Sequence, residues 1–165
     1  MTDDLNEEVT TPDPEPETTP ADTFVTMAEG STSFSASFLQ EVIALIQALG
    51  FTLTEGDAVL LAYCAEYVEQ EIRNACNVPE VPEGLYKVAE GLIVARFLTA
   101  KKAKKEVDAE TLDFYSPMLK ELSEGDTKQV WDTSTGSTPE QRLDLFIRAL
   151  EDGRSQFITY RRLKW

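Results

Sequence analysis

Apolar residues recur at the three- and four-residue spacing of a helix in four separate stretches of the chain. The first stretch is SASFLQEVIALIQALG, in which Ser37 and Gln40 match the pattern of a capping box at a helix start. Gly50 is placed to end this helix in the left-handed conformation that glycine adopts without strain. The side chains expected in the core are Leu39, Val42, Ile43, Ile46 and Leu49.

The second stretch, TEGDAVLLAYCAEYVEQEIRNACN, predicts a long amphipathic helix. Thr54 is its expected N-cap, with Asp57 three residues on, and it is expected to stop at Asn77, before the two-proline connector VPEVP. Its apolar stripe consists of Leu61, Cys64, Ala65, Val68, Ile72 and Ala75. Its solvent side is expected to carry Glu66, Glu69, Gln70 and Arg73.

The third stretch predicts a helix with Pro82 at its first position, followed by EGLYKVAEGLIVARFLTAKKAKK. This segment is apolar on more than one side, which is typical of a helix at the centre of a bundle or in a subunit interface. Gly91 inside it indicates a close contact with another helix. The basic end of the segment suits the negative end of the helix dipole.

The remaining segments are less regular until the last helix. Residues 109–124 predict a helix broken at Pro117, and residues 127–132 predict a short strand between turns. The fourth periodic stretch then begins at Thr138 as N-cap, with Pro139 at the first helical position and Gln141 completing a capping box. Its buried stripe is expected to be Leu143, Phe146, Ile147 and Leu150, with Gly153 ending the helix.

These patterns predict an all-α fold, a small bundle of four to five helices with one short β-like segment. The helical domain is expected to span residues 33–153. It is expected to be flanked by a disordered acidic extension over residues 1–32 and by an extended C-terminal arm over residues 154–165.

Charge is unevenly spread along the chain. The formal net charge is −15, and residues 1–30 hold nine acids and no Lys or Arg. Because this segment is also rich in Pro and Thr, it has little to bury and is predicted to be disordered. Two interpretations stay open: a solvated tail, or a self-repelling arm that reaches a partner. The rest of the chain is only mildly acidic, which argues against a nucleic-acid binder with a broad basic face.

Few residues suggest chemistry. The chain has no His and none of the common nucleophile, phosphate-loop or metal motifs, so we expect no catalysis, no metal and no cofactor. Cys64 and Cys76 lie on one predicted helix, roughly 18 Å apart, beyond disulfide reach, and are expected to be reduced. No stretch approaches the length of a membrane span, and no secretory signal is recognisable.

Two basic segments remain as candidate contact sites. Lys101, Lys102, Lys104 and Lys105 form either a solvated helix end or a contact for DNA phosphates. The terminal SQFITYRRLKW alternates aromatic, aliphatic and basic residues, types enriched in binding hot spots. This segment either folds back on its own bundle or docks on another protein as an extended peptide.

Several stretches together resemble the head–tail connector (adaptor, or head-completion) proteins of long-tailed bacteriophages. The resemblance rests on a long helix ending in NACN, a PEGL helix start, an EGDT segment, a TPE-R helix and a terminal YRRLKW, and it covers roughly residues 38–165. The acidic N-terminal extension and the FYSPMLK stretch depart from the usual pattern.

The resemblance implies a structural virion protein, not an enzyme, assembled in the host cytoplasm into a ring of typically twelve copies in the neck. Such a ring sits beneath the portal protein, passes double-stranded DNA without sequence-specific binding, and offers a dock for a stopper or tail-completion protein. The expected portal-binding residues are Phe157, Ile158, Tyr160, Arg161, Arg162, Leu163, Lys164 and Trp165. The candidate subunit interface is the second apolar side of the third helix, at Leu92, Ile93, Arg96 and Phe97. The alternative is a small helical DNA-associated packaging or regulatory module that uses the four lysines.

Overall fold

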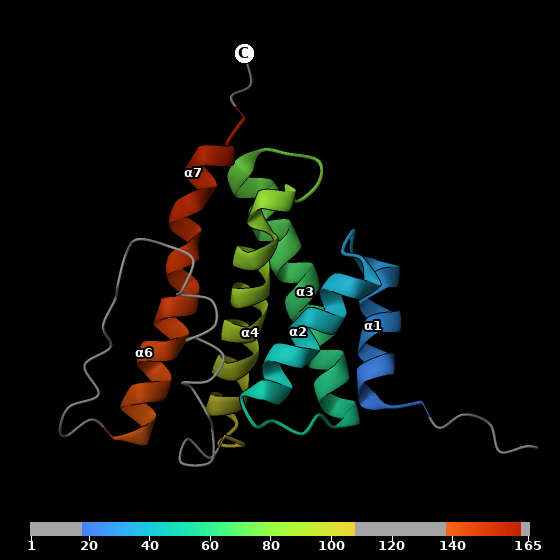
Figure 1. Cartoon of the computed structure of the whole chain (residues 1–165), viewed down its shortest axis with the longest axis vertical. Helices are drawn as coiled ribbons and strands as arrows, with labels where there is room; N and C mark the ends of the chain where they lie inside the picture. The colour runs from blue at the N-terminus through green and yellow to red at the C-terminus, as the bar shows by residue number, and fades with distance from the viewer. Residues whose placement is uncertain (1–17, 108–137, 163–165) are drawn as a thin grey trace, which may run out of the picture.

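The computed structural model describes residues 18–107 and 138–162, and these residues form helices packed lengthwise against one another (Figure 1). The long helices run alternately up and down, with α4 in the middle of the bundle. The predicted all-α bundle is confirmed, and the described residues contain no strand. The broken helix over 109–124 and the strand over 127–132 lie outside the described residues. The elements are α1 Pro20–Ser31, α2 Ala36–Ala48, α3 Glu55–Cys76, the 3-10 turn η1 Glu83–Leu85, α4 Tyr86–Ala103, α6 Pro139–Glu151, the 3-10 turn η3 Asp152–Gln156, and α7 Phe157–Tyr160.

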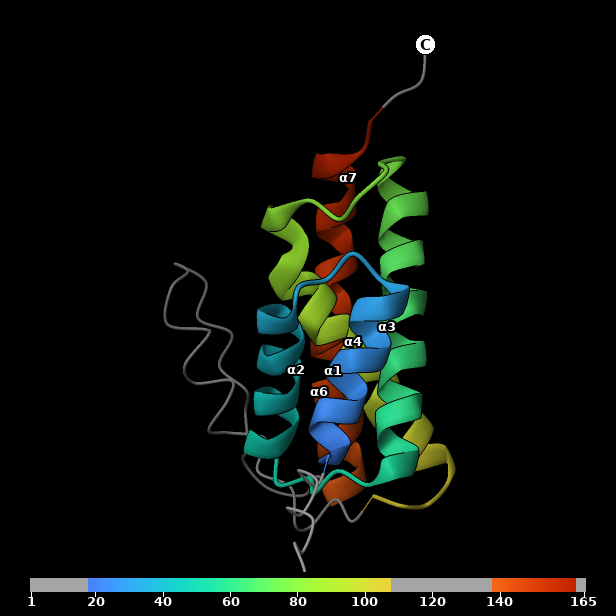
Figure 2. The same cartoon turned by 90° about the vertical axis from the view of Figure 1, so that its right-hand side faces the viewer.

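Helix α1 corrects the prediction that residues 1–32 are disordered. It starts with a capping box between Thr19 and Asp22, and its Phe24 and Ala28 are fully buried. Helix α1 packs lengthwise on α3 and also contacts α2 (Figure 2). A 12-residue helix is marginal on its own, so this packing is what stabilises it. Residues 1–17 lie outside the described residues.

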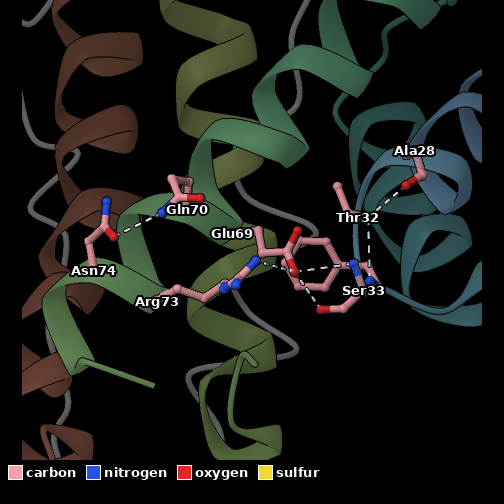
Figure 3. Close-up of polar contacts among 8 residues, drawn as sticks. Ala28, Thr32, Ser33, Glu69, Gln70, Arg73 and Asn74 are labelled. Atoms are coloured by element: carbon pink, nitrogen blue, oxygen red, sulfur yellow. Dashed lines mark hydrogen bonds and ion pairs between the residues drawn. The ribbon is translucent and has the colours of Figure 1, made fainter. Parts of the chain in front are cut away.

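The contact between α1 and α3 also reverses the expected exposure of Glu69. This carboxylate was predicted to face solvent, but it is buried where the end of α1 covers α3. Ser33 donates to Glu69 Oε1 from its backbone N–H at 3.2 Å and from its hydroxyl at 2.5 Å (Figure 3). The Arg73 guanidinium lies 4.0 Å from the same oxygen. Glu69 therefore joins α3 to the turn that follows α1.

Replacing Ser33 by Ala is expected to lower the free energy of unfolding by about 1 kcal/mol, because a buried carboxylate loses a short hydrogen bond. Urea unfolding followed by circular dichroism would measure the change. The matched control is Ser31→Ala at the exposed end of α1, which should have almost no effect. Equal midpoints for the two variants would contradict the proposed role of Ser33.

Helix α2 ends as predicted but starts two residues earlier. Its N-cap is Ser35, whose hydroxyl accepts from the Phe38 N–H, so the predicted cap at Ser37 is wrong. At the other end Gly50 has a φ of 93°, the left-handed conformation expected of it. The Gly50 N–H donates to the Gln47 carbonyl and the Phe51 N–H to the Ile46 carbonyl, so two of the last carbonyls of the helix have partners.

Helix α3 has the predicted ends. The backbone N–H and hydroxyl of Thr54 both donate to Asp57 Oδ2, at 3.0 and 2.8 Å. Asn77 ends the helix in the left-handed conformation with a φ of 53°. The apolar stripe is correct except at its end, where Ala75 is exposed and Cys76 is buried in its place. Cys64 and Cys76 are both buried and unpaired, in agreement with the expectation of reduced thiols.

Helix α4 is the central helix that its apolar pattern predicts. It begins after η1, so Pro82 precedes a 3-10 turn and is not the first residue of the α-helix. The predicted close contact at Gly91 is confirmed: a Cβ built there would lie 3.5 Å from Leu150 of α6. Burial on nearly every side also removes most of the expected interface residues from the surface, since Leu92, Ile93 and Phe97 are fully buried.

Helix α6 begins with the predicted capping box at Thr138 and buries Leu143, Phe146 and Ile147, with Leu150 partly buried. The prediction that Gly153 ends the chain's last helix is wrong. The chain continues through η3 into α7, and Gly153 instead lies against α4, where an added Cβ would come within 3.0 Å of Val88. This glycine allows a close approach between two segments.

Candidate functional site: the C-terminal segment

The C-terminal segment lies along the bundle instead of extending away from it from residue 154 onward. Helix α6, η3 and α7 follow one another beside α4 and reach the end of the bundle where α3 stops (Figures 1 and 2). Residues 157–160 are helical, so the prediction of an extended arm fails for this part. The chain turns extended only at Arg161, which has a φ of −68° and a ψ of 122°.

Two aromatic side chains anchor this segment on its own bundle. Phe157 is buried, and its carbonyl accepts from the Cys76 thiol at 3.5 Å. Tyr160 is partly buried over η1, where Gly84 leaves room for its ring. A Cβ at Gly84 would lie 2.0 Å from the Tyr160 hydroxyl oxygen, so only glycine fits under this ring. Both residues were expected to bind the portal, and here they contact the bundle of their own chain.

A pair of hydrogen bonds fixes the next residue. The Arg162 N–H donates to the Cys76 carbonyl at 2.8 Å, and the Asn77 side-chain amide donates to the Arg162 carbonyl at 3.0 Å. The Cys76 carbonyl belongs to the last turn of α3, where carbonyls need partners from outside the helix. Asn77 suits this place because asparagine tolerates the left-handed conformation and carries an amide donor.

An ion-pair network holds η3 against the middle of the bundle. Glu71 accepts from Arg96 at 2.8 Å with one oxygen and from Arg154 at 2.7 Å with the other. Burial by itself would raise the pKa of Glu71, but the hydrogen bonds from Arg96 and Arg154 outweigh it and hold that pKa below its usual value. Arg96 was expected at a subunit interface; it instead joins α4 to α3, and its guanidinium lies 3.7 Å from the centre of the Tyr67 ring.

The outward-facing part of the segment is small. Ile158 is 79% exposed, and Arg161 and Arg162 are exposed as well. Leu163, Lys164 and Trp165 lie outside the described residues. The expected docking residues therefore divide into two groups: Phe157 and Tyr160 contact the bundle, whereas Ile158, Arg161 and Arg162 are available to another molecule.

The lysines at the end of α4 are not a uniform basic surface. Lys101 is only 8% exposed, and its ammonium donates to Asp57 at 2.8 Å and to Glu106 at 2.7 Å. Burial would lower the pKa of Lys101, but the hydrogen bonds to these carboxylates outweigh it and raise that pKa. Lys102 pairs with Asp144 of α6. Lys104 and Lys105 remain exposed, so the expectation of a solvated or DNA-facing residue is wrong for Lys101.

The contacts bring together motifs that are far apart in the sequence. Cys76 and Asn77 come from the NACN stretch, Gly84 from PEGL, and Tyr160 and Arg162 from YRRLKW, and all of them meet at one end of the bundle. Sequence order alone does not reveal this meeting. The helix end expected at Asn77 and the glycine in PEGL were the available signals.

Gly84→Ala is expected to displace the Tyr160 ring, because the new methyl group occupies its place. Hydrogen–deuterium exchange should then show lower protection over residues 157–162, while the amides of α2 and α3 stay protected. The matched control is Gly30→Ala, since an added Cβ there meets nothing within 4 Å. Unchanged protection of residues 157–162 in Gly84→Ala would contradict the close packing of Tyr160.

In residues 18–107 and 138–162, no group of three His, Cys, Asp or Glu side chains could hold a metal ion. No helix within those ranges has the length and apolar character needed to cross a membrane. No model of a known protein family, no curated protein and no solved structure matches the chain.

Proposed function

We propose that this chain is a structural subunit of a bacteriophage head–tail connector ring, which binds the portal protein through the end of its C-terminal segment. The observation that carries the proposal is the meeting of NACN, PEGL and YRRLKW at one end of the bundle. These motifs are three of those on which the resemblance to connector proteins rests. Their mutual contacts have one shared effect, which is to hold residues 157–162 against the bundle.

The proposed portal contact is narrower than the whole segment. Among the described residues its members are Ile158, Arg161 and Arg162, whose side chains are exposed, and the proposal keeps Leu163, Lys164 and Trp165 as expected members. The exposed arginines would meet acidic groups on the portal, and Ile158 would supply apolar contact. In the same proposal about twelve copies form the ring, DNA passes through its lumen, and the opposite face receives a stopper or tail-completion protein.

The alternative, a DNA-associated module, is disfavoured by the lysine contacts. Lys101 and Lys102 are engaged with carboxylates of the same chain, which leaves Lys104 and Lys105 as the exposed part of that cluster. Few phosphate contacts give weak binding, because this kind of affinity grows with the number of phosphates neutralised. A gel shift of labelled duplex DNA at low salt that persists at physiological salt would revive this alternative.

Deletion of residues 161–165 tests the proposal directly. The truncated chain should keep the helical circular-dichroism signal, because Phe157 and Tyr160 remain, and should lose binding to purified portal in a pull-down. The control is the Lys104→Ala, Lys105→Ala double variant, which changes exposed charges at the other end of α4 and should bind portal normally. Full portal binding by the truncated chain would disprove the proposed contact.

A further inference from the structure

Two exposed lysines at the end of α4 have no partner among the described residues. Lys104 and Lys105, called the lysine tip below, follow the last turn of α4 and are both exposed. Lys101 and Lys102, just before them, form ion pairs with carboxylates of the same chain, whereas no described carboxylate lies within ion-pair distance of the lysine tip. The lysine tip is therefore the part of the four-lysine cluster that can still bind an anion.

The backbone fixes the position of the lysine tip. Lys105 has a φ of 59°, in the left-handed region. Its N–H donates to the Lys102 carbonyl at 2.9 Å, and the Glu106 N–H donates to the Lys101 carbonyl at 3.0 Å. Glycine or asparagine is usual where a helix ends in this way, so the turn alone does not explain a lysine at this position.

This end of the bundle is not positive as a whole. Apart from the Lys102–Asp144 pair, the first turns of α1, α3 and α6 and the end of α4 bring five carboxylates together with four cations. Because exposed charges more than about 8 Å apart are largely screened at physiological salt, an anionic partner has to contact the two ammonium groups of the lysine tip directly. The carboxylates are those of Asp22, Glu55, Asp57, Glu106 and Glu140, and the cations are Lys101, Lys104, Lys105 and Arg142.

Residues 1–17, called the acidic arm below, directly precede α1 and are opposite in charge to the lysine tip. The start of α1 lies at the same end of the bundle as the start of α3 and the end of α4 (Figures 1 and 2). The bond between Lys101 and Asp57 joins α4 to α3 at this end. The acidic arm has no Lys or Arg, and its seven acids are Asp3, Asp4, Glu7, Glu8, Asp13, Glu15 and Glu17.

The acidic arm is long enough to reach the lysine tip. Helix α1 packs on α3, and α3 packs on α4. The axes of packed helices lie roughly 8–10 Å apart, so the path from α1 past α3 to α4 is about 20 Å. An extended residue covers roughly 3.3 Å, and about six residues cross this distance. The crossing leaves the acids at positions 3, 4, 7 and 8 free to meet the lysine tip.

We propose that the acidic arm folds back over the end of α4 in its own chain, pairs with Lys104 and Lys105, and screens them from the phosphate groups of DNA. Each carboxylate–ammonium pair at an exposed site is weak. The tether compensates, because a short connection within one chain holds the two groups at an effective concentration of roughly millimolar. This contact is independent of the proposed function, and it decides between the two interpretations of the acidic segment in favour of an arm with a target.

Zero-length cross-linking of the full chain tests the contact, since a carbodiimide joins a carboxylate to an amine only when the two touch. Peptide mapping should find the acids at positions 3–8 linked to Lys104 or Lys105 at several times the level of links to Lys87. Lys87 is the matched control, a lysine near the other end of α4 with a side chain that is 65% exposed. The links should disappear in about 1 M salt, where the screening length falls to about 3 Å.

The distribution of the links decides the outcome. Links to Lys104 and Lys105 no more frequent than links to Lys87 overturn the contact, and so does a preference for Lys164. A mixture of chains with and without nitrogen-15 separates links within one chain from links between chains. Links found mainly between chains overturn the folding back of the arm and assign the lysine tip to a second copy.

Duplex DNA tests the screening role. A full-length variant with the seven acids of the arm replaced by Asn or Gln should bind labelled duplex DNA several-fold more strongly than the wild type at low salt. Adding Lys104→Gln and Lys105→Gln to that variant should remove the gain. A gain that survives these two changes reflects net charge alone and overturns the screening role, as does the absence of any gain. Neither experiment contains portal, so failure of portal binding leaves this inference standing.

Discussion

The Phe97→Ala variant is expected to lose about 3–5 kcal/mol of its free energy of unfolding. Phe97 is fully buried in the centre of α4, and its ring packs edge to face on Phe51 with centroids 5.7 Å apart. Removing the ring takes away its apolar burial and leaves a cavity that neighbouring side chains fill only in part. Urea unfolding of the isolated chain, followed by circular dichroism, measures the loss.

This result separates the two roles that the sequence allowed for the apolar side of α4. If Phe97 belonged to a subunit interface, its replacement would weaken assembly and leave the free subunit as stable as before. The milder variant Phe97→Leu should lose about 1 kcal/mol and stay folded, which keeps the comparison measurable. Tyr63→Ala is the matched control, an aromatic residue removed from an exposed position of α3, and should change stability little.

The second large effect is expected at Asp57. Asp57→Ala should lower the free energy of unfolding by about 2–3 kcal/mol, because the same carboxylate caps α3 and pairs with the buried Lys101 ammonium. The loss stays below the cost of a fully isolated buried charge, since Glu106 still accepts from Lys101. Lys101→Met tests the other partner and should cost less, because methionine fills the same space without a charge.

The Asp57 pair also predicts a pH dependence. Burial would raise the pKa of Asp57, but hydrogen bonds from Lys101 and Thr54 outweigh it and hold that pKa below its usual value. A carboxylate with a lowered folded-state pKa stabilises the fold above its unfolded pKa of about 3.9, and this stability is lost as the pH falls through the folded value. Asp57→Asn should therefore lose less stability than the wild type between pH 5 and about pH 2. Parallel pH profiles for the two chains would contradict the ion pair.

The four helices with strong apolar periodicity could be predicted because their signals are local. In α6, for example, Thr138, Pro139 and Gln141 define the start, and Leu143, Phe146 and Ile147 define the buried side within ten residues. Helix α1 gives a much weaker signal, since only Phe24 and Ala28 are buried and its surroundings are rich in Pro, Thr and acid. The misplacement of Glu69 follows from this, because α1 is what covers it.

The candidate site was predictable in composition but not in geometry. The aromatic and basic residues of the last segment indicated a contact site. The sequence left open whether this segment binds the chain's own bundle or another protein. Which side chains pack on the bundle depends on two glycines that are distant in sequence from the residues they contact. Gly84 lies under Tyr160, and Gly153 lies against Val88. The sequence around these glycines does not indicate which residues they contact. The structure was therefore needed to divide the segment into residues that contact the bundle and residues whose side chains are exposed.

The bond between Arg162 and the end of α3 has a mechanical consequence. A pull on the chain terminus is carried by several contacts at once: the paired hydrogen bonds at Arg162, the Tyr160 ring over Gly84 and the buried Phe157. Because these contacts connect to α3 and to η1, a tensile load would spread over two elements of the bundle. A load applied at Arg162 would therefore have to break contacts with α3 and η1 before it separated α6 from α4.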